Sequence, residues 1–343
     1  MTNLLIHSDN LTGLQYLLDN GYEGKIDLIY IDPPFATGGN FTITDGRAST
    51  ISNSKKGALA YSDTLVGKEF IAFLKERLLL IRELMSKQGS IYLHIDYKIG
   101  HYVKVMMDEV FGIENFRNDI TRIKCNPKNF KRIGYGNIKD LILFYTKTSK
   151  AIWNEPKEKY SESDLIKLFP KVDAKGRRYT TVPLHAPGET QNGNSSQPFK
   201  GLNPPVGRHW RTDVETMEKW DSLGLIEWSS SGNPRKIIYA DECDGKRKQD
   251  IWEFKDPQYP QYPTEKNEEM LDLVVRTSSN ENSIVMDCFC GSGTTLAAAH
   301  KNNRNWIGID QSQHAIDATR KKLESIESTL FYEKPKVEIL ELQ

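Results

Sequence analysis

One stretch decides the fold: Asp287-Cys288-Phe289-Cys290-Gly291-Ser292-Gly293, set between an apolar run at 283–287 and a helix-forming segment. Glycines at a strand-to-helix junction permit a tight turn and let a ligand approach the backbone, while the helix start offers N–H groups without intrahelical partners. A second apolar run, 306–310, ends in Asp310, 17 residues past Gly293, where a carboxylate can accept both hydroxyls of a ribose. The stretch and this acid together predict an α/β sheet that binds a nucleoside.

The glycine turn departs from two other nucleotide-binding turns. A P-loop requires Gly-Lys followed by Ser or Thr, whereas this chain continues Gly293-Thr294-Thr295. A dinucleotide turn favours a third glycine where this chain has Leu296. Triphosphates and dinucleotides are therefore disfavoured. A tight turn with no ligand is the alternative, and the presence of Asp310 argues against it.

Alternating strand and helix patterns extend outward from this turn. Apolar runs at 4–6, 26–31 and 91–95 predict buried strands, and a stripe of apolar residues at helical spacing predicts a helix between the last two. The stripe comprises Phe70, Leu74, Leu78, Ile81 and Met85. The pattern is lost from about 121 to 255, where prolines and glycines crowd 181–207 and predict loops.

The fold that accounts for this order is a doubly wound, mostly parallel α/β sheet, Rossmann-like, interrupted by a smaller irregular module. We predict one half of the sheet domain at 1–120, the module at 121–254 with a returning strand near 141–147, and the other half at 255–343. A chain of 343 residues is long enough to divide in this way.

The composition is ordinary for a soluble protein, with 46 Lys and Arg against 46 Asp and Glu. Four cysteines without a CxxC pair fit a reducing cytoplasm, and no apolar run is long enough to span a bilayer. We therefore expect a cytoplasmic protein with no membrane partner. The histidines show no HxxxH or HExxH spacing, so we expect no metal site.

The segment Asp32-Pro33-Pro34-Phe35 directly follows the second predicted strand, at the edge where open α/β sheets bind ligands. Two prolines fix the backbone and remove two N–H donors, which leaves a rigid group of acceptors. Asp32 and the Pro33 carbonyl can accept the two hydrogens of an exocyclic amine, and Phe35 offers a face on which a planar base stacks. A plain Pro-Pro loop is the alternative.

These motifs, in this order, resemble the amino-methyltransferases that modify DNA bases with S-adenosyl-L-methionine, specifically the β-ordered group. In that group the Asp-Pro-Pro-aromatic segment precedes the target-recognition region and the cofactor turn comes last, a circularly permuted order. Phe35 stands where tyrosine is commoner, and Asn267 replaces a usual proline. The further matching stretches are His7-Ser8-Asp9-Asn10-Leu11, Gly89-Ser90-Ile91-Tyr92-Leu93-His94-Ile95-Asp96, Met107-Asp108-Glu109-Val110-Phe111-Gly112, Tyr262-Pro263-Thr264-Glu265-Lys266 and Trp306-Ile307-Gly308-Ile309-Asp310.

The resemblance implies two sets of site residues. The catalytic pocket is formed by Asp32, Pro33, Pro34 and Phe35. The cofactor is bound by Asp9, Thr264, Lys266, Asp287, Phe289, Gly291, Ser292, Gly293 and Asp310, with Thr264 and Lys266 near its carboxylate end. An aspartate at position 32 is the usual residue of adenine-N6 enzymes in this family, whereas serine is frequent in cytosine-N4 enzymes.

Two basic clusters are candidates for binding double-stranded DNA. The stretch 121–139 carries six cations and no acid, interleaved with aromatic residues, a local excess that the neutral total conceals. The second cluster lies in the irregular module. We predict DNA contacts from Arg122, Lys124, Lys128, Lys131, Arg132, Arg177, Arg178 and Arg208. A solvated surface is the alternative for the first cluster.

The target amine is buried in the duplex stack, so we predict that its base flips into the pocket at Asp32 and Phe35. The stretch 36–61, rich in Gly, Ser, Thr and Asn, is predicted to be a mobile flap beside it. His94 and Asp96 end another predicted strand at the same edge, either as a substrate contact or as a structural pair.

We predict a site-specific DNA adenine-N6 methyltransferase of a restriction–modification system, with S-adenosyl-L-methionine as its cofactor. One alternative is the same fold acting on cytosine N4. Another, from a different class, is a noncatalytic DNA-binding specificity subunit. Double-stranded DNA is the expected partner, while a homodimer and a cognate restriction endonuclease stay open as further partners.

Overall fold

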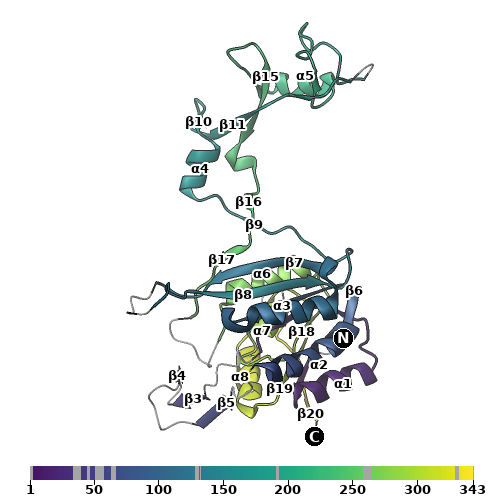
Figure 1. The fold of residues 1–343 in the computed structure, drawn as a ribbon. Helices are drawn as coiled ribbons and strands as arrows, with labels where there is room; N and C mark the ends of the chain where they lie inside the picture. Colours follow the sequence, from purple (N-terminus) through teal and green to yellow (C-terminus); the bar gives the residue numbers. More distant parts are fainter. Residues whose placement is uncertain are drawn as a thin grey trace. The chain divides into compact units, whose positions relative to one another are not determined.

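The computed structural model describes residues 3–33, 40–44, 47–50, 58–62, 67–127, 131, 133–190, 193–257, 265–328 and 332–342, with the backbone alone between 40 and 62. The chain divides into two compact units (Figure 1). The sheet unit comprises Met1–Pro156 and Gln249–Gln343, and the inserted unit comprises Lys157–Lys248.

The sheet unit is built on a nine-stranded sheet. Every neighbouring pair is parallel except for those of one strand, β8, which runs antiparallel to both neighbours. The predicted doubly wound, mostly parallel sheet is therefore confirmed. In spatial order the strands are β17 (Ile251–Glu253), β7 (Phe116–Ile123), β8 (Lys139–Thr146), β6 (Met85–Ile95), β2 (Ile26–Ile31), β18 (Ile284–Asp287), β19 (Asn305–Asp310), β1 (Asn3–His7) and β20 (Val337–Glu341).

Helices cover both faces of this sheet, because its central strands are apolar on both sides. Ile29 of β2 faces one core and its neighbour Leu28 faces the other. The first core is closed by α1 (Asn10–Asp19), α2 (Lys68–Leu84) and α3 (Tyr97–Phe111). The second core is closed by α6 (Glu268–Ser278), α7 (Thr294–Lys301) and α8 (Gln313–Glu324).

The apolar stripe predicted for α2 packs as expected except at its end. Phe70, Leu74, Leu78 and Ile81 are buried, but the helix ends at Leu84. Met85 is instead the first residue of β6, where it lies beside Ile26 across an irregular register. An apolar residue satisfies either element at this junction, so the periodicity alone did not locate the boundary.

The chain connections change direction at the centre of the sheet, between the parallel strands β2 and β18. From β2 the chain proceeds through α2 to β6 on one side, and from β18 it proceeds through α7 to β19 on the other. α2 and α7 pack on opposite faces. The loops after β2 and β18 therefore leave in opposite directions, which is the arrangement that opens a ligand crevice at the carboxyl edge of such sheets.

The inserted unit has a small core of its own, formed by Leu184, Phe199, Trp210 and Met217. Its four-stranded sheet contains β10 (Lys171–Val172), β11 (Arg178–Pro183), β15 (Pro234–Tyr239) and β14 (Ile226–Trp228). Two further pairs are β12 (His185–Pro187) with β13 (Arg208–Trp210) and β9 (Lys157–Glu158) with β16 (Lys246–Arg247). The helical segments are α4 (Glu162–Leu168), α5 (Val214–Ser222) and the 3-10 turn η2 (Ala240–Glu242).

This unit is narrower than the region 121–254 expected from sequence, because β7, β8 and β17 belong to the central sheet. The stretch expected as a flap, 36–61, contains a three-stranded antiparallel sheet of β4 (Arg47–Thr50), β3 (Asn40–Thr44) and β5 (Ala58–Ser62). A 3-10 turn, η1 (Ile113–Asn115), follows α3. Within the described part of the chain, no helix is both long and apolar enough to cross a bilayer.

Candidate active site

Three aspartates end neighbouring strands at the carboxyl edge of the central sheet. Asp32 follows β2, Asp287 ends β18 and Asp310 ends β19. β18 pairs in parallel with both β2 and β19, so the three carboxylates lie along one edge at the central switch. The fold thus brings together residues that are more than 250 positions apart in the sequence.

The glycine stretch forms the tight turn that its sequence predicts. Gly291 and Gly293 have φ values of +50° and +73°, in the left-handed region where a side chain is disfavoured. A Cβ added at Gly293 would lie 2.8 Å from the Cγ2 and Oγ1 atoms of Thr319. Thr319 in turn donates from its hydroxyl to the Gly291 carbonyl at 2.9 Å. Glycine is therefore required at position 293 by both conformation and space.

Asp287 holds this turn from inside. Its Oδ1 accepts the Phe289 amide at 3.0 Å, and its Oδ2 accepts the Thr295 hydroxyl at 2.6 Å. The side chain is almost completely buried, and burial raises the pKa of Asp287 to about 7. The Phe289 ring lies 6.4 Å from that of Phe73, and the Ser292 hydroxyl is 3.0 Å from that of Thr294.

Asp310 links the turn to the next strand and keeps acceptor capacity. Its Oδ2 accepts the Gly291 amide at 3.0 Å and its Oδ1 accepts the Ser312 amide at 2.9 Å. Burial raises the pKa of this carboxyl. A carboxylate has about four lone-pair sites, so this side chain can still accept a further donor. A rigid acid beside a glycine turn fits the two hydroxyls of a ribose.

Asp9 lies at the same edge, two residues past β1, which pairs with β19. It caps α1 by accepting the Leu11 amide at 2.9 Å. The buried guanidinium of Arg77 donates to Asp9 Oδ2 at 3.1 Å and also contacts Asn10. Asn10 donates to the Cys288 carbonyl at 3.3 Å, so this cluster braces the start of the glycine turn.

Asp32 has two differently occupied oxygens. Its Oδ2 forms an ion pair with Lys266 at 2.7 Å. Its Oδ1 is buried and has no hydrogen-bond partner among the described residues, and the Nδ1 atom of His94 is 3.6 Å away. Pro33 is buried beside it. The structure thus places Lys266 on the candidate catalytic acid. The other predicted members Pro34, Phe35 and Thr264 lie outside the described residues.

A buried polar chain continues behind Asp32. The Tyr30 hydroxyl is 2.9 Å from His94 Nδ1, and His94 Nε2 is 3.2 Å from an oxygen of Asp140. Burial, and then the charge of Lys266, lower the pKa of His94, which favours a neutral ring. Asp140 also accepts from Lys124 at 2.6 Å. We assign the ring proton to Nε2, facing Asp140, since Nδ1 then accepts the tyrosine hydroxyl.

Sequence reasoning missed Tyr30 and Asp140 as parts of this chain. It placed His94 at the correct edge and offered Asp96 as its structural partner. Asp96 instead caps α3 by accepting the Lys98 amide at 2.9 Å. The only signal for the true partner was a polar residue, Asp140, at the start of an apolar strand.

Comparisons with known proteins match this arrangement. A family profile described as DNA methylase, covering N6 and N4 enzymes, matches residues 26–321. The chain belongs to this DNA methylase family. The predicted resemblance is confirmed, and with it the methyl donor of the family, S-adenosyl-L-methionine, for which the glycine turn and Asp310 provide a fitting cradle.

Relatives of the methylase include restriction–modification proteins. The Type II methyltransferase M.EcaI of Enterobacter cloacae is 40% identical over 328 residues, covering 94% of this chain and 69% of that protein. The Mod subunit of the Type III enzyme StyLTI from Salmonella typhimurium is 26% identical over 333 residues, covering 86% of this chain and 49% of that protein. The chain thus spans about half the length of this Type III relative.

A solved structure supports the fold of the methylase. The protein TTHA0409 of Thermus thermophilus, in complex with S-adenosyl-L-methionine, aligns with a TM-score of 0.50. The alignment covers 99% of this chain and 98% of that chain at 14% identity.

Two predicted DNA-binding cations of the methylase are engaged inside the protein. Arg122 is fully buried, with Nε donating to the Phe254 carbonyl at 2.8 Å and an ion pair to Asp256 at 2.5 Å. Its guanidinium therefore has no surface to offer a phosphate. Lys124 is half-buried and paired with Asp140. Lys131 is exposed, whereas Lys128 and Arg132 lie outside the described residues.

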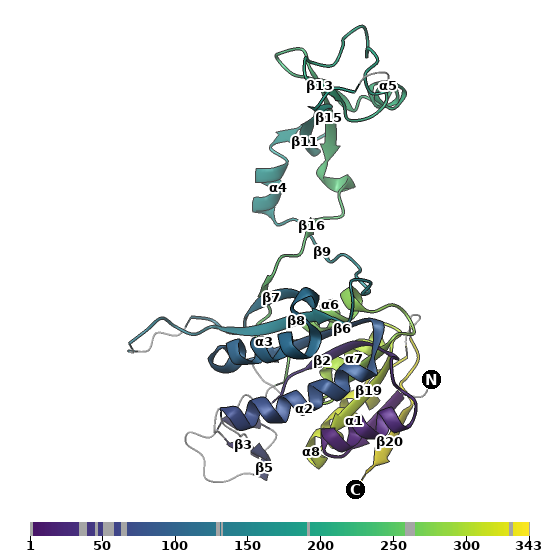
Figure 2. The same ribbon diagram turned by 45° about the vertical axis from the view of Figure 1, so that its right-hand side comes forward.

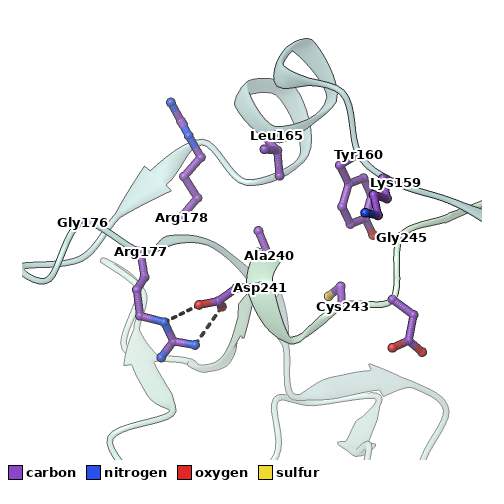
Figure 3. A pocket seen from close by; sticks show the side chains of 11 residues that line it. Lys159, Tyr160, Leu165, Gly176, Arg177, Arg178, Ala240, Asp241, Cys243 and Gly245 are labelled. Atoms are coloured by element: carbon purple, nitrogen blue, oxygen red, sulfur yellow. Dashed lines mark hydrogen bonds and ion pairs between the residues drawn. The ribbon is translucent and has the colours of Figure 1, made fainter.

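The inserted unit contains a cavity of about 600 Å³ that two more of these cations line (Figure 3). Arg177 donates from Nε and from a terminal nitrogen to Asp241, both at 2.8 Å, and contacts Glu242 as well. Figure 3 shows the Arg178 side chain pointing away from this pair. Arg208 is exposed, and a terminal nitrogen of its guanidinium lies 3.0 Å from Nδ1 of His185. Arg177 is thus neutralised, while Arg178 and Arg208 are not ion-paired to any described acid.

The described residues of the methylase contain no group of three or more His, Cys, Asp or Glu side chains placed to hold a metal ion. Cys288 and Cys290 flank Phe289 as buried thiols, and burial raises the pKa of each well above its ordinary value. They pack behind the glycine turn.

Proposed function

We propose that this methylase transfers a methyl group from S-adenosyl-L-methionine to N6 of adenine at a specific site in duplex DNA, after the base flips out of the helix. The observation that carries the proposal is the buried Oδ1 of Asp32, between the ends of β2 and β18, for which the described residues supply no hydrogen-bond donor. A buried acceptor without a donor is costly, and an exocyclic amine supplies the missing hydrogen.

The cofactor supplies an electrophilic methyl group on its sulfonium. Asp310 would hold the ribose through its free lone pairs, and the backbone from Gly291 to Gly293 would line the same ligand without a side chain in the way. Asp287 keeps that backbone in shape through Phe289 and Thr295. These residues position the donor at the strand edge next to Asp32.

Asp32 and the Pro33 carbonyl would accept the two hydrogens of the target amine. The lone pair of that nitrogen is delocalised into the ring, and hydrogen bonds that draw it toward tetrahedral geometry make it available for attack. Lys266 fixes Asp32 through Oδ2, which leaves Oδ1 for the amine. The nitrogen would bond to the methyl carbon as the S–CH3 bond of the sulfonium breaks, which leaves a neutral thioether. The proton that the nitrogen then loses would pass to the Asp32 carboxylate, so the transfer is direct and needs no covalent enzyme intermediate.

Adenine is proposed over cytosine because the acid at position 32 is the residue usual in adenine-N6 members of this family. The alternative activity, methylation of cytosine N4, would use the same fold and the same methyl donor. The chain is also proposed to act as the modification half of a restriction–modification pair in the cytoplasm, in keeping with its named relatives and its four free cysteines.

The test is nucleoside analysis after incubation of the protein with methyl-labelled cofactor and a diverse pool of duplex DNA. Label in N6-methyladenine supports the proposal, and label in N4-methylcytosine replaces adenine by cytosine. Wild-type protein that binds the cofactor and DNA yet transfers no label would favour a noncatalytic specificity subunit. Methylation-sensitive sequencing of the product then reports the site.

A further inference from the structure

The hairpin between β7 and β8 projects from the edge of the sheet that carries Asp32. β8 pairs with β6 so that Leu141 lies opposite Ile95, the last residue of β6. Ile123 pairs with Lys139, and the Lys124 amide still donates to the Ile138 carbonyl at 2.9 Å. The described residues beyond this bond therefore extend past the carboxyl edge, as Figures 1 and 2 both show.

Two large apolar side chains stand at the tip of this hairpin. Ile133 and Tyr135 have relative exposures of 107% and 97%, among the highest of the large apolar residues in the described chain. Gly134 between them has a φ of +123°, and a Cβ built there meets no atom within 4 Å. The tip thus rests on no described part of the protein, so its apolar groups serve no core.

The charges around the tip indicate what these side chains meet. The sequence 125–139 contains four cations and no acid, and Lys131 and Lys139 are exposed on either side of the apolar pair in the sequence. Such a surface suits a partner that is anionic outside and apolar within. Duplex DNA has this structure, with phosphates outside and stacked bases inside, and the edge that bears the tip also bears Asp32.

We propose that Ile133 and Tyr135 enter the base stack where the target base leaves it, while Lys131 and Lys139 contact the neighbouring phosphates. Apolar side chains inserted between bases offset the loss of stacking, and extrusion of a base is unfavourable without such help. The inference rests on the proposed function, because it requires that the target base flips.

The experiment compares single-turnover methylation by four proteins on two duplexes. The duplexes carry the site found by sequencing, one fully paired and one with an abasic position opposite the target base. The test variant is Ile133→Ala with Tyr135→Ala. Its matched control is Tyr102→Ala with Ile113→Ala, an exposed pair of the same residue types, on α3 and η1.

The test variant should methylate the paired duplex roughly tenfold more slowly than wild type, and the abasic duplex within about twofold, because the abasic partner has already weakened the pair. The control should match wild type on both. The conservative variant Ile133→Leu with Tyr135→Phe should methylate the paired duplex at nearly the wild-type rate, because it keeps the apolar volume.

Three results would overturn the inference. The first is an unchanged rate of the test variant on the paired duplex, and the second is an equal loss of rate on both duplexes. The third is a loss of binding of the test variant to anionic phospholipid vesicles, measured by co-sedimentation, without any loss of DNA methylation. If wild-type protein methylates neither duplex, the proposed function itself fails. That outcome is distinct from the three results above, in each of which wild-type protein is active.

Discussion

At the scale of single residues, the candidate site is defined by acids whose oxygens have different partners. Each oxygen of Asp287 accepts one hydrogen bond, from the glycine turn and from the start of the helix after it. One oxygen of Asp310 accepts from the glycine turn, and the other accepts from the loop after β19. Asp32 gives one oxygen to Lys266 and leaves the other without a described partner. The three carboxylates at one strand edge are therefore expected to respond differently to substitution.

Replacing Asp32 with Ala should abolish methyl transfer, with a loss of at least about a hundredfold, and leave cofactor affinity within about twofold. In the proposed mechanism the carboxylate orients the amine, whereas the proposed cofactor site lies at the ends of β18 and β19. Label transfer and calorimetric binding of S-adenosyl-L-methionine measure the two effects. Asp27→Ala, at the other end of β2, is the control. Equal loss of binding and transfer would show that Asp32 supports the cofactor instead.

Asp287 should make the folded methylase less stable as pH rises. An aspartate in the unfolded chain has a pKa near 4, whereas burial raises the pKa of Asp287 to about 7. Between these values the folded protein holds a proton that the unfolded chain has released. Its contribution to the free energy of unfolding therefore falls from pH 4 to pH 7, by at most about 1.4 kcal/mol per pH unit.

Urea unfolding of wild type and Asp287→Asn at pH 5, 6 and 7 without cofactor checks this sign. The free energy of unfolding of wild type, relative to the variant, should decrease at each step. Parallel curves for the two proteins would mean that Asp287 is ionised in the folded state.

At the scale of elements, the strand-to-helix turn after β18 depends on a close contact with α8. The Cβ that any other residue would bring to position 293 collides with Thr319, whose hydroxyl supports the Gly291 carbonyl. The turn and α8 are thus coupled through a single threonine. Displacing Thr319 should change the same backbone that is proposed to line the cofactor.

Gly293→Ala should destabilise the methylase more than Gly224→Ala and should weaken cofactor binding about tenfold or more. Both glycines have similar backbone conformations, with φ values of +73° and +69°, but a Cβ at Gly224 meets nothing within 4 Å. The strain of a left-handed alanine, about 1 kcal/mol, is therefore common to both. Thermal unfolding measures the stability of the two variants, and calorimetry measures their affinity for the cofactor. Equal effects of the two substitutions would show that the contact with Thr319 does not matter.

The elements of the sheet unit could be predicted from sequence because they depend on local patterns. The apolar runs of β2 and β18, the stripe of α2 and the glycine turn are each read within about twenty residues. The partner of Lys266 and the hydrogen-bonded chain from Tyr30 to Asp140 could not be predicted, because they join residues that are far apart in the sequence.

Arg122 was wrongly predicted to be an exposed DNA-binding residue, because its partners are also distant in the sequence. A count of charges over 121–139 treats every cation as exposed, but the acid that pairs with Arg122, Asp256, lies 134 residues away in the sequence. The buried guanidinium of Arg122 also donates a hydrogen bond to the Phe254 carbonyl. By contrast, Lys131 and Lys139 of the same stretch are exposed, as the count predicted.

At the scale of the whole molecule, the inserted unit begins and ends at one place. Glu158 and Lys246 are paired neighbours in β9 and β16, so the two crossings of the chain lie about 5 Å apart. The unit has its own core around Trp210. Its removal therefore leaves a short gap that a few flexible residues can close.

A protein in which a short Gly-Ser linker replaces Lys157–Lys248 should fold and bind S-adenosyl-L-methionine with nearly the affinity of the full chain, but should lose site-specific methylation. Calorimetry and methylation-sensitive sequencing measure the two properties. A full-length protein with Trp210→Ala, which opens the small core, serves as the comparison. Retained site specificity in the shortened protein would place target choice in the sheet unit.

The interleaved order of the sheet has a consequence for how the methylase is made. β1 and β2 are synthesised first, yet β18 and β19 lie between them in the finished sheet. At typical translation speeds, roughly 15–55 s separate the emergence of Ile31 from that of Asp310. During this interval the facing edges of the two early strands have no partner. A nascent chain that has not been translated past Asp310 therefore lacks half of the proposed cofactor site, and we expect methyl-donor binding only from longer chains.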